Sequence, residues 1–334
     1  MRRLRLSAAA LVATSLVLAG CGGDDESPAG EPESQEVAAG ATLDSTWPLT
    51  GLPVKGDDSA AQDHPVLVVK MDNTASSAPQ LGLGKADLVV EELVEGGLTR
   101  LAAFYYSKVP GDVGPVRSMR ASDIGIVAPA DASVVTSGAA GRTIARIKGA
   151  GISFFQEGAP GFYRASGRSA PYNLMANLTD VAASIDVDEA RPDDYLPWGD
   201  EKDLPKGQAA KTIAASFSGG HTTNWVFGKG GYVNENTHAA AGDEFPADNV
   251  LVLRVQVGDA GYLDPGGNRV PETKFTGQGQ AMLFHDGRLV RGTWSKSSLD
   301  APLKLSTKAG KLIVPAGRTW IELIPADGGD VTFR

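Results

Sequence analysis

The stretch HPVLVVKMDN, residues 64–73, decides how the folded part of this 334-residue chain is built. Its apolar side chains follow one another without the polar alternation of a half-exposed strand, which is typical of a strand buried on both faces. Ligands bind at the ends of such strands in open α/β sheets, and this one ends in Asp72 and Asn73. The stretch therefore predicts an α/β layer with polar side chains at one edge of its sheet.

The segments that follow support the same class. We expect strands at 99–107, 132–138 and 152–158, and a strand or a helix at 86–93, because each is a short apolar run. Helices are expected at 141–151, which stops on glycine, and at 173–185. Strands mixed with helices indicate an N-terminal α/β domain, a mixed sheet with helices, over residues 47–205.

The pattern changes after about residue 215. Short apolar runs are separated there by Gly, Asp and Pro, and Asp286-Gly287 between two of them is a strong hairpin signal. We therefore expect a mainly antiparallel, β-rich C-terminal domain over residues 206–334. The boundary is placed within 192–208, a segment rich in Pro and charge.

The first 20 residues have the features of an export signal. Arg2, Arg3 and Arg5 precede an apolar run, 6–18, that is too short to span a membrane. The end of this segment, LAGC, looks like a bacterial lipobox, and that resemblance implies cleavage before Cys21 and lipidation of its thiol. Because the chain has one cysteine, neither a disulfide nor a cysteine metal site is expected.

A linker separates the lipidated cysteine from the folded part. Residues 21–46 are rich in Gly, Pro, Ser and acid, which is typical of a flexible tether. Removal of residues 1–20 leaves 28 basic and 40 acidic side chains, a formal charge of −12. This acidic balance argues against nucleic acid as a partner and against electrostatic attraction to anionic lipid. We expect an exported protein anchored to the outer face of the cell membrane by acyl chains on Cys21.

Several segments, in order from Trp47 to Pro325, resemble the YerB-type bacterial lipoproteins. They are WPLTGLPV, PVLVVKMDN, ADLVVEELVEGGLTRLAAFYYS, VGPVRSMR, GFYRASGRSAPYNL, QAMLFHDGRLVRGTWSK and GRTWIELIP. The resemblance implies a lipobox leader followed by N- and C-terminal parts, each classed as a domain of unknown function. It predicts location and architecture rather than a reaction. One departure is Tyr172, which stands where the family pattern has a histidine before the asparagine of A-P-x-N-L.

The stretch VGPVRSMRASD, residues 113–123, contains the first candidate site. If a helix starts at Pro115, then Arg117, Arg120 and Asp123 share one face of it. The free N–H groups of that helix start, with the two arginines, would then bind a phosphate or a carboxylate. The alternative is that both arginines pair with nearby acids and hold the sheet together. Those acids are Glu91, Glu92 and Glu95.

A second polar loop extends the candidate anion site. Arg164 and Arg168 in YRASGRSAPYNL would form the other wall of the pocket, and Asn73 and Asn173 would orient the anion by hydrogen bonds. The alternative is an exposed connection in which Asn173 caps the following helix.

Four acids form a candidate carboxylate cluster: Asp72, Asp87, Glu91 and Glu95. A glycosidase would need two of them beside a sugar bond, and a hard cation would need several converging oxygens, but the spacing shows neither. If 86–93 is a strand, Glu91 and Glu92 point to opposite faces, so at most one of them lies with Asp72. The four histidines are scattered, so neither a metal nor another cofactor is expected.

Binding of an anionic ligand or an envelope protein through the N-terminal domain is the leading functional hypothesis, since no nucleophile stands out. An enzyme acting on envelope glycans or lipid-linked phosphates is an alternative, because residues 86–120 are loosely similar to LytR-CpsA-Psr glycopolymer transferases. That similarity implies Asp87 or Asp72 near a metal and Arg117 on a phosphate. A structural protein that docks through the β-rich part is the third possibility.

Overall fold

The computed structural model describes residues 45–334. The predicted signal segment, its lipidated Cys21 and all but the end of the predicted tether lie outside the described residues. Within the described part, no helix is both long enough and apolar enough to span a lipid bilayer.

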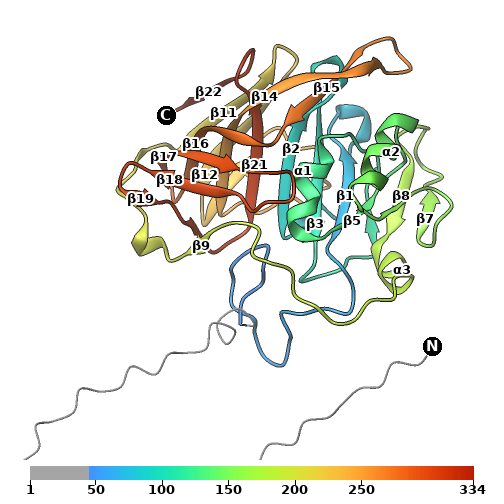
Figure 1. Ribbon diagram of the computed structural model, residues 1–334, viewed down its shortest axis with the longest axis horizontal. Helices are drawn as coiled ribbons and strands as arrows, with labels where there is room; N and C mark the ends of the chain where they lie inside the picture. Colours follow the sequence, from blue (N-terminus) through green and yellow to red (C-terminus); the bar gives the residue numbers. More distant parts are fainter. Residues whose placement is uncertain (1–44) are drawn as a thin grey trace, which may run out of the picture. The chain divides into compact units, whose positions relative to one another are not determined.

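One sheet of 13 strands organises the described residues (Figure 1). Its order is β19-β18-β17-β16-β14-β21-β2-β3-β1-β5-β6, with β10 beside β17 and β15 beside β14. The strands are β1 (Leu67–Asp72), β2 (Leu88–Leu93), β3 (Thr99–Tyr105), β5 (Ser133–Val135), β6 (Phe154–Phe155), β10 (Gln208–Ala209), β14 (Asn249–Leu263), β15 (Arg269–Lys274), β16 (Gly277–His285), β17 (Arg288–Lys296), β18 (Lys304–Thr307), β19 (Gly310–Lys311) and β21 (Thr319–Pro325).

Smaller elements surround this sheet. A four-stranded sheet has the order β13-β12-β11-β22, a three-stranded sheet the order β4-β8-β7, and β9 pairs with β20. Their strands are β4 (Asp112–Val113), β7 (Phe162–Arg164), β8 (Leu174–Asn177), β9 (Trp198–Gly199), β11 (Thr212–Ser218), β12 (His221–Gly228), β13 (Gly231–Asn234), β20 (Val314–Pro315) and β22 (Asp330–Phe333). The α-helices are α1 (Asp123–Val127), α2 (Gly141–Gly149) and α3 (Leu178–Ala183).

The predicted fold class is confirmed: the N-terminal part is a mixed sheet with a few helices, and the later strands are mostly antiparallel. The ambiguous run at 86–93 is strand β2. Asp286 and Gly287 turn between β16 and β17 with φ of 46° and 67°, as a tight hairpin of this type requires.

Strand β21 joins the two parts of the chain. It lies parallel to both of its neighbours, so that Ile321 is opposite Leu251 of β14 on one side and Val90 of β2 on the other. The main sheet therefore runs without interruption from strands before residue 205 to strands after it. The division into domains at that position stays a prediction about the sequence.

The sheet separates two apolar cores. Val68, Val90 and Leu253 pack on the face covered by α1 and α2, together with Ile126 and Ile147 of those helices. The alternate residues of the same strands face the β11–β12 sheet, in a second core that contains Trp225 and Trp320. Because side chains alternate along a strand, neighbouring residues of β1, β2 and β3 belong to different cores.

One predicted helix is shorter than expected, and another does not form. Residues 173–185 form strand β8 and then the short helix α3, whose first turn is capped by Asn177 through a 3.1 Å hydrogen bond from the Asp180 amide, and not by Asn173. Pro115 opens no helix either, because the Val116 amide donates to Leu174 and the Arg117 amide to Lys70. The backbone of this segment therefore hydrogen bonds to neighbouring strands, and the next helix, α1, begins at Asp123.

A two-stranded arm leaves the sheet near its middle. Strand β14 pairs with β21 up to Val255, and from Gln256 onward it pairs with β15. We call residues 256–274 the β14–β15 arm; Figure 1 shows it in orange. It docks on α2 through a 2.6 Å hydrogen bond from Arg142 Nη1 to the Gly261 carbonyl, and through a 2.9 Å contact between the Thr143 and Tyr262 hydroxyls.

Candidate functional site

Three arginines meet where β1 ends and β3 begins, and we call them the arginine cluster: Arg100, Arg117 and Arg120. Arg100 on β3 stands opposite Asp72 of β1 and Glu92 of β2, so the three side chains leave the sheet on the same face. Arg117 and Arg120 come from the irregular segment that crosses this edge. They do not share a helix face as the sequence predicted, yet the fold still brings them together.

Arg100 is the most buried member of the cluster. Its residue surface is 7% exposed, and its Nη1 donates a 3.0 Å hydrogen bond to the Ser118 carbonyl. Its Nε has no hydrogen-bond partner among residues 45–334. Burial, followed by the charges of Arg120 and Arg117, lowers the pKa of Arg100 to about 10. Burial of a cation with an unused hydrogen-bond donor costs free energy, and an anion bound to this side chain would reduce that cost.

Arg120 is held by a carboxylate, as the alternative interpretation of the sequence anticipated. Its Nε and Nη2 each lie 2.6 Å from an oxygen of Glu95, and its Nη1 donates to the Met119 carbonyl. Burial opposes the charge of Arg120, but the hydrogen bonds and charge of Glu95 outweigh burial and raise the pKa of Arg120. This bidentate pair fixes the position of the guanidinium.

Arg117 has fewer hydrogen bonds within the protein than Arg120. Its Nε donates to Asp72 Oδ2 at 2.8 Å, and its side chain is 22% exposed. The guanidinium lies 5.3 Å from the centroid of the Tyr172 ring, an attractive cation–π arrangement. Neither Nη1 nor Nη2 has a hydrogen-bond partner within the described part of the chain. Arg117 therefore keeps spare donors at a partly open position.

A pocket of about 540 Å³ adjoins the cluster at Arg120. Its walls come from the arginine segment, from the loop that leads from β5 into α2, and from the β14–β15 arm. The lining residues are Glu95, Ser118, Arg120, Ser137, Ala139, Ala140, Tyr262, Leu263, Asp264, Pro265 and Val270. The carboxyl ends of the parallel strands β1 and β5 lie here, which is where α/β sheets bind ligands.

A buried ionic triad supports the cluster from below. Lys70 Nζ lies 3.0 Å from Glu92 and 2.6 Å from Asp123, and all three side chains are fully buried. Burial raises the pKa of Glu92, and Lys70 acts in the opposite direction. Asp123 also accepts a 2.6 Å hydrogen bond from the amide of Arg120, which ties the arginine segment to the triad.

Two predicted site residues lie on the opposite face of the sheet. Asn73 donates to Glu91 at 3.0 Å and to Thr99 at 2.9 Å, so its side chain points away from the arginine cluster. Glu91 also accepts from His221 at 2.9 Å and stands in register with Glu322 of β21. Burial, and next the charge of Glu91, raise the pKa of Glu322 well above its usual range. The alternation of β2 separates these groups from Asp72.

The remaining predicted residues have local partners. Arg164 pairs with Glu157 at 2.5 Å and donates to Asn173 at 2.7 Å on an exposed turn. Arg168 donates to the carbonyls of Ser77 and Pro79 and so anchors the loop that brings Tyr172 to Arg117. Asp87 accepts from the Tyr106 and Ser107 amides, at the other end of β2 from the cluster. Hence neither Arg164, Asn173 nor Asp87 faces the pocket.

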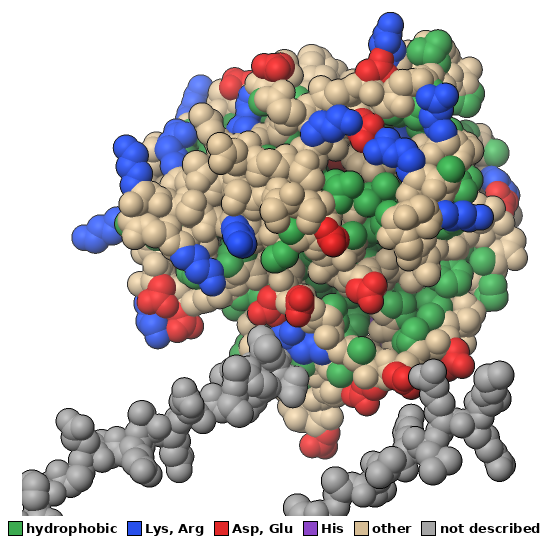
Figure 2. All heavy atoms as spheres, in the orientation of Figure 1, with side chains coloured by type: hydrophobic (Ala, Val, Ile, Leu, Met, Phe, Trp, Pro, Cys, Tyr) green, Lys and Arg blue, Asp and Glu red, His purple; other side chains and the backbone are tan. Residues whose placement is uncertain are grey.

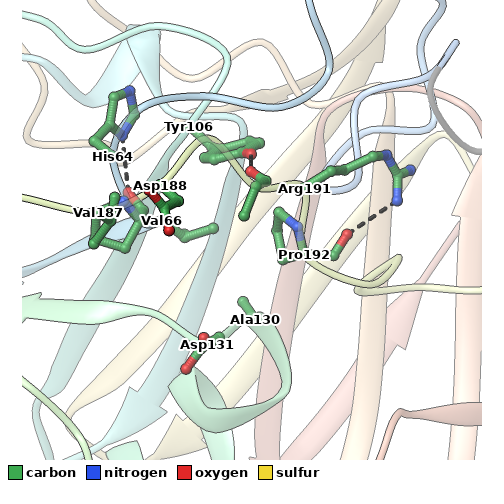
Figure 3. A pocket seen from close by; sticks show the side chains of 11 residues that line it. His64, Val66, Tyr106, Ala130, Asp131, Val187, Asp188, Arg191 and Pro192 are labelled. Carbon is green, nitrogen blue, oxygen red and sulfur yellow. Dashed lines mark hydrogen bonds between the residues drawn. The ribbon is translucent and has the colours of Figure 1, made fainter. Parts of the chain in front are cut away.

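A second, smaller pocket of about 170 Å³ lies between His64, Tyr106 and Arg191 (Figure 3). Two of its donors are already paired: Arg191 donates to Thr46, Pro192 and Asp194, and the Tyr106 hydroxyl donates to Ala190. The arginine of this pocket is therefore already committed to neighbouring groups of the protein. Across residues 45–334, no group of three or more His, Cys, Asp or Glu side chains is arranged to hold a metal.

Arg100 was missed by reasoning from the sequence. The signal was present in TRLAAFYYS, where a single cation begins a strand that is otherwise apolar. Lys70 within VLVVKMDN is the same kind of exception. A charge in a fully buried strand needs a partner, so both positions pointed to the polar edge of the sheet.

Comparison with known proteins is consistent with this architecture. Residues 49–191 match the N-terminal domain of DUF3048, a protein of unknown function, and residues 213–321 match its C-terminal domain. The putative lipoprotein YerB of Bacillus subtilis (strain 168) is 25% identical over 293 residues, which cover 83% of this chain and 86% of that protein. The crystal structure of Bacillus subtilis YerB matches with a TM-score of 0.71 at 20% identity, over 86% of this chain and 99% of that one, which shows a shared fold. The chain therefore belongs to the DUF3048 family of proteins of unknown function.

Proposed function

We propose that this protein binds a small anionic ligand at the arginine cluster. The observation that carries the proposal is Arg100, whose buried Nε lacks a partner while Arg117 and Arg120 lie close enough to lower its pKa. Asp72 pairs with Arg117 and Glu95 with Arg120, whereas Arg100 has no ion pair within the described residues. A bound anion would accept from the spare donors of Arg100 and Arg117.

Binding is favoured over catalysis by the hydroxyl groups beside the cluster. The Ser118 and Ser137 hydroxyls lie 3.2 Å apart, and in the described residues neither hydrogen bonds to an imidazole or a carboxylate. A hydroxyl nucleophile needs an adjacent base to become reactive. The arrangement supplies donors for an anion rather than an activated attacking group.

The proposal places the binding site outside the cell membrane. Its support is the leader that ends in LAGC and the similarity to a protein named as a putative lipoprotein. Acyl chains on Cys21 would hold the chain at the outer face, and the acidic segment that follows would separate the binding site from the bilayer.

Isothermal titration of the full-length chain in detergent with phosphate, sulfate and citrate tests anion binding. The Arg117→Gln variant removes two spare donors at a position that is partly open. We expect its affinity to fall tenfold or more, about 1.4 kcal/mol, because a charge-assisted hydrogen bond is lost. Arg164→Gln is the matched control, since Arg164 is exposed and paired away from the pocket. Equal affinities of the two variants, or no saturable binding of any anion, would remove the proposal.

A further inference from the structure

We infer that Tyr172 positions the guanidinium of Arg117 so that its two Nη nitrogens face an oxyanion that presents two oxygens side by side. Such a ligand carries a carboxylate, a sulfate or a phosphate group. The inference rests on the proposed function, because it assumes that the arginine cluster binds an anion. It adds the residue that sets the geometry of the site and the class of anion that this geometry selects.

The guanidinium of Arg117 is held on two sides and open on a third. Its central carbon lies over the Tyr172 ring, 5.3 Å from the ring centroid, and its Nε donates to Asp72 Oδ2 at 2.8 Å. Nη1 and Nη2 have no hydrogen-bond partner among residues 45–334, and the side chain is 22% exposed. The protein therefore fixes the guanidinium through the ring and Nε, and leaves the edge formed by the two Nη atoms free to donate.

Tyr172 contributes to neither apolar core. Its ring is half-buried and is absent from both clusters of packed apolar side chains, and its hydroxyl has no hydrogen-bond partner in the part of the chain that the structure describes. The contact with Arg117 is thus the specific interaction that the ring makes. Removal of the ring should therefore change the position of Arg117 more than it changes the stability of the fold.

Arg168 fixes the loop that carries Tyr172. This loop joins β7 to β8, and Arg168 donates from Nη1 to the Ser77 carbonyl at 2.9 Å and from Nη2 to the Pro79 carbonyl. The Tyr172 amide donates to the Ser169 carbonyl at 2.9 Å, which closes a turn just before the ring. The loop is thereby tied to the segment that leaves β1 beside the arginine cluster. Arg168 therefore acts on the anion through Tyr172 rather than by touching it.

The free edge of Arg117 selects the shape of the anion. Nη1 and Nη2 of a guanidinium donate in nearly parallel directions within one plane, which matches two oxygens of one carboxylate, sulfate or phosphate group. A halide offers a single acceptor and cannot use both donors in this way. Because a tilted guanidinium would lose one of the two oxygens, a ring that limits the tilt increases the discrimination between oxyanions and halides.

A basic surface adjoins the arginine cluster. Figure 2 shows Lys and Arg side chains gathered where the β14–β15 arm and α2 lie, and α2 contributes Arg142, Arg146 and Lys148 but no acid. Such a surface attracts any anion, whatever its shape, and the attraction weakens as salt screens it. Selection by shape must therefore be measured between anions of equal charge and at constant ionic strength.

Titration of the full-length chain in detergent with sulfate, at constant ionic strength, tests the role of Tyr172. We expect Tyr172→Leu to lower the affinity about two- to fivefold, the effect of losing a cation–π contact at an exposed site. Tyr172→Phe should keep the wild-type affinity because the ring remains. Tyr163→Leu is the matched control, since Tyr163 is 39% exposed on the neighbouring strand β7 and lines none of the pockets described above.

A double-mutant cycle separates positioning from a general effect on the fold. Arg168→Gln alone should reproduce the loss of affinity caused by Tyr172→Leu. In the Arg117→Gln background, neither Tyr172→Leu nor Arg168→Gln should lower the affinity further, because both act through Arg117. Equal losses with and without the Arg117 side chain would overturn the positioning role.

Acetate and chloride, which both carry one negative charge, test the class of anion. Acetate should displace sulfate at a concentration at least tenfold lower than chloride does, and Tyr172→Leu should reduce this ratio. Displacement at equal concentrations overturns the assigned class, and a wild-type affinity of Tyr172→Leu overturns the role of the ring, while anion binding stands in both cases. Absence of saturable binding of sulfate, phosphate and citrate removes the proposed function, and the inference with it.

Discussion

Replacement of Lys70 by methionine tests whether the buried triad supports the arginine site. Methionine has similar length and fills the same space, but it removes the cation that lies 3.0 Å from Glu92 and 2.6 Å from Asp123. Both acids remain fully buried and face each other without a counter-charge. The structure then keeps a buried negative charge only at a high cost, or takes up a proton.

The expected loss of stability follows from the complete burial of Lys70, Glu92 and Asp123. Removal of one partner from a buried ionic group destabilises a protein by about 3–5 kcal/mol. Uptake of a proton by Glu92, whose pKa burial already raises, limits the loss to the lower end, about 3 kcal/mol. For a chain of this size, each kcal/mol lowers the melting temperature by about 2–4 °C, so we expect a decrease of roughly 6–12 °C at pH 8.

The loss should also depend on pH, with a definite sign. In the variant, the folded-state pKa of Glu92 rises further above its unfolded value, so the folded protein binds a proton that the unfolded chain releases. Stability of the variant then falls as pH rises from the unfolded pKa to the folded one. The gap between wild type and Lys70→Met is therefore larger at pH 8 than at pH 5.

Thermal unfolding of both proteins at pH 5 and pH 8 measures this gap, with Lys229→Met as the control for loss of an exposed lysine. A double variant, Lys70→Met with Glu92→Gln, should recover part of the stability because it removes one of the two unpaired acids. A loss below about 1 kcal/mol at pH 8, or a gap that does not change with pH, would refute the assigned role of Lys70.

Three further predictions follow from the described contacts and the leader. Glu322→Gln should raise the melting temperature relative to wild type, and increasingly so from pH 5 to pH 9, because burial and then Glu91 raise the pKa of Glu322 and ionisation of the folded protein costs stability as pH rises. Gly279→Ala should destabilise by about 1–3 kcal/mol in urea titrations, since the added Cβ overlaps the Arg254 carbonyl oxygen. Cys21→Ser should abolish labelling by an alkyne fatty acid and move the protein from the membrane fraction to the soluble one; retention in the membrane fraction would count against the lipid anchor.

Sequence patterns predicted the elements whose structure depends on local residues. The apolar runs at 64–73 and 99–107 form strands, and GRTIARIKG forms a helix, because each buries its apolar side chains on the expected face. The segment after Pro115 was misjudged because its amides bond to Lys70 and Leu174, strands that are distant in the sequence. Propensity and capping signals contain no information about such partners.

The positions of the candidate site residues were predicted only in part, for the same reason. Arg117 and Arg120 were found because they form a visible pair of charges, and the pairing of Arg120 with Glu95 was one of the stated alternatives. Asn73 was assigned to the wrong face of the sheet. Neighbouring residues of a strand point to opposite faces, and tertiary packing decides which face of β1 meets the helices. The proximity of Tyr262 to Arg120 could not be predicted, because the two residues are 142 positions apart in the sequence.

The pocket beside Arg120 is lined by residues from both parts of the chain, whereas the sequence predicted binding through the N-terminal domain. Ser118, Arg120 and Ser137 lie within the region that matches the first family model, whereas Tyr262 and Leu263 lie within the region that matches the second. The arm reaches α2 because β14 continues past the main sheet, and β14 itself is held in that sheet by β21 beside β2. Each region therefore supplies one wall of the pocket, and the central strand that joins them determines their spacing. An isolated N-terminal region would keep the arginines but lose the wall that the arm provides.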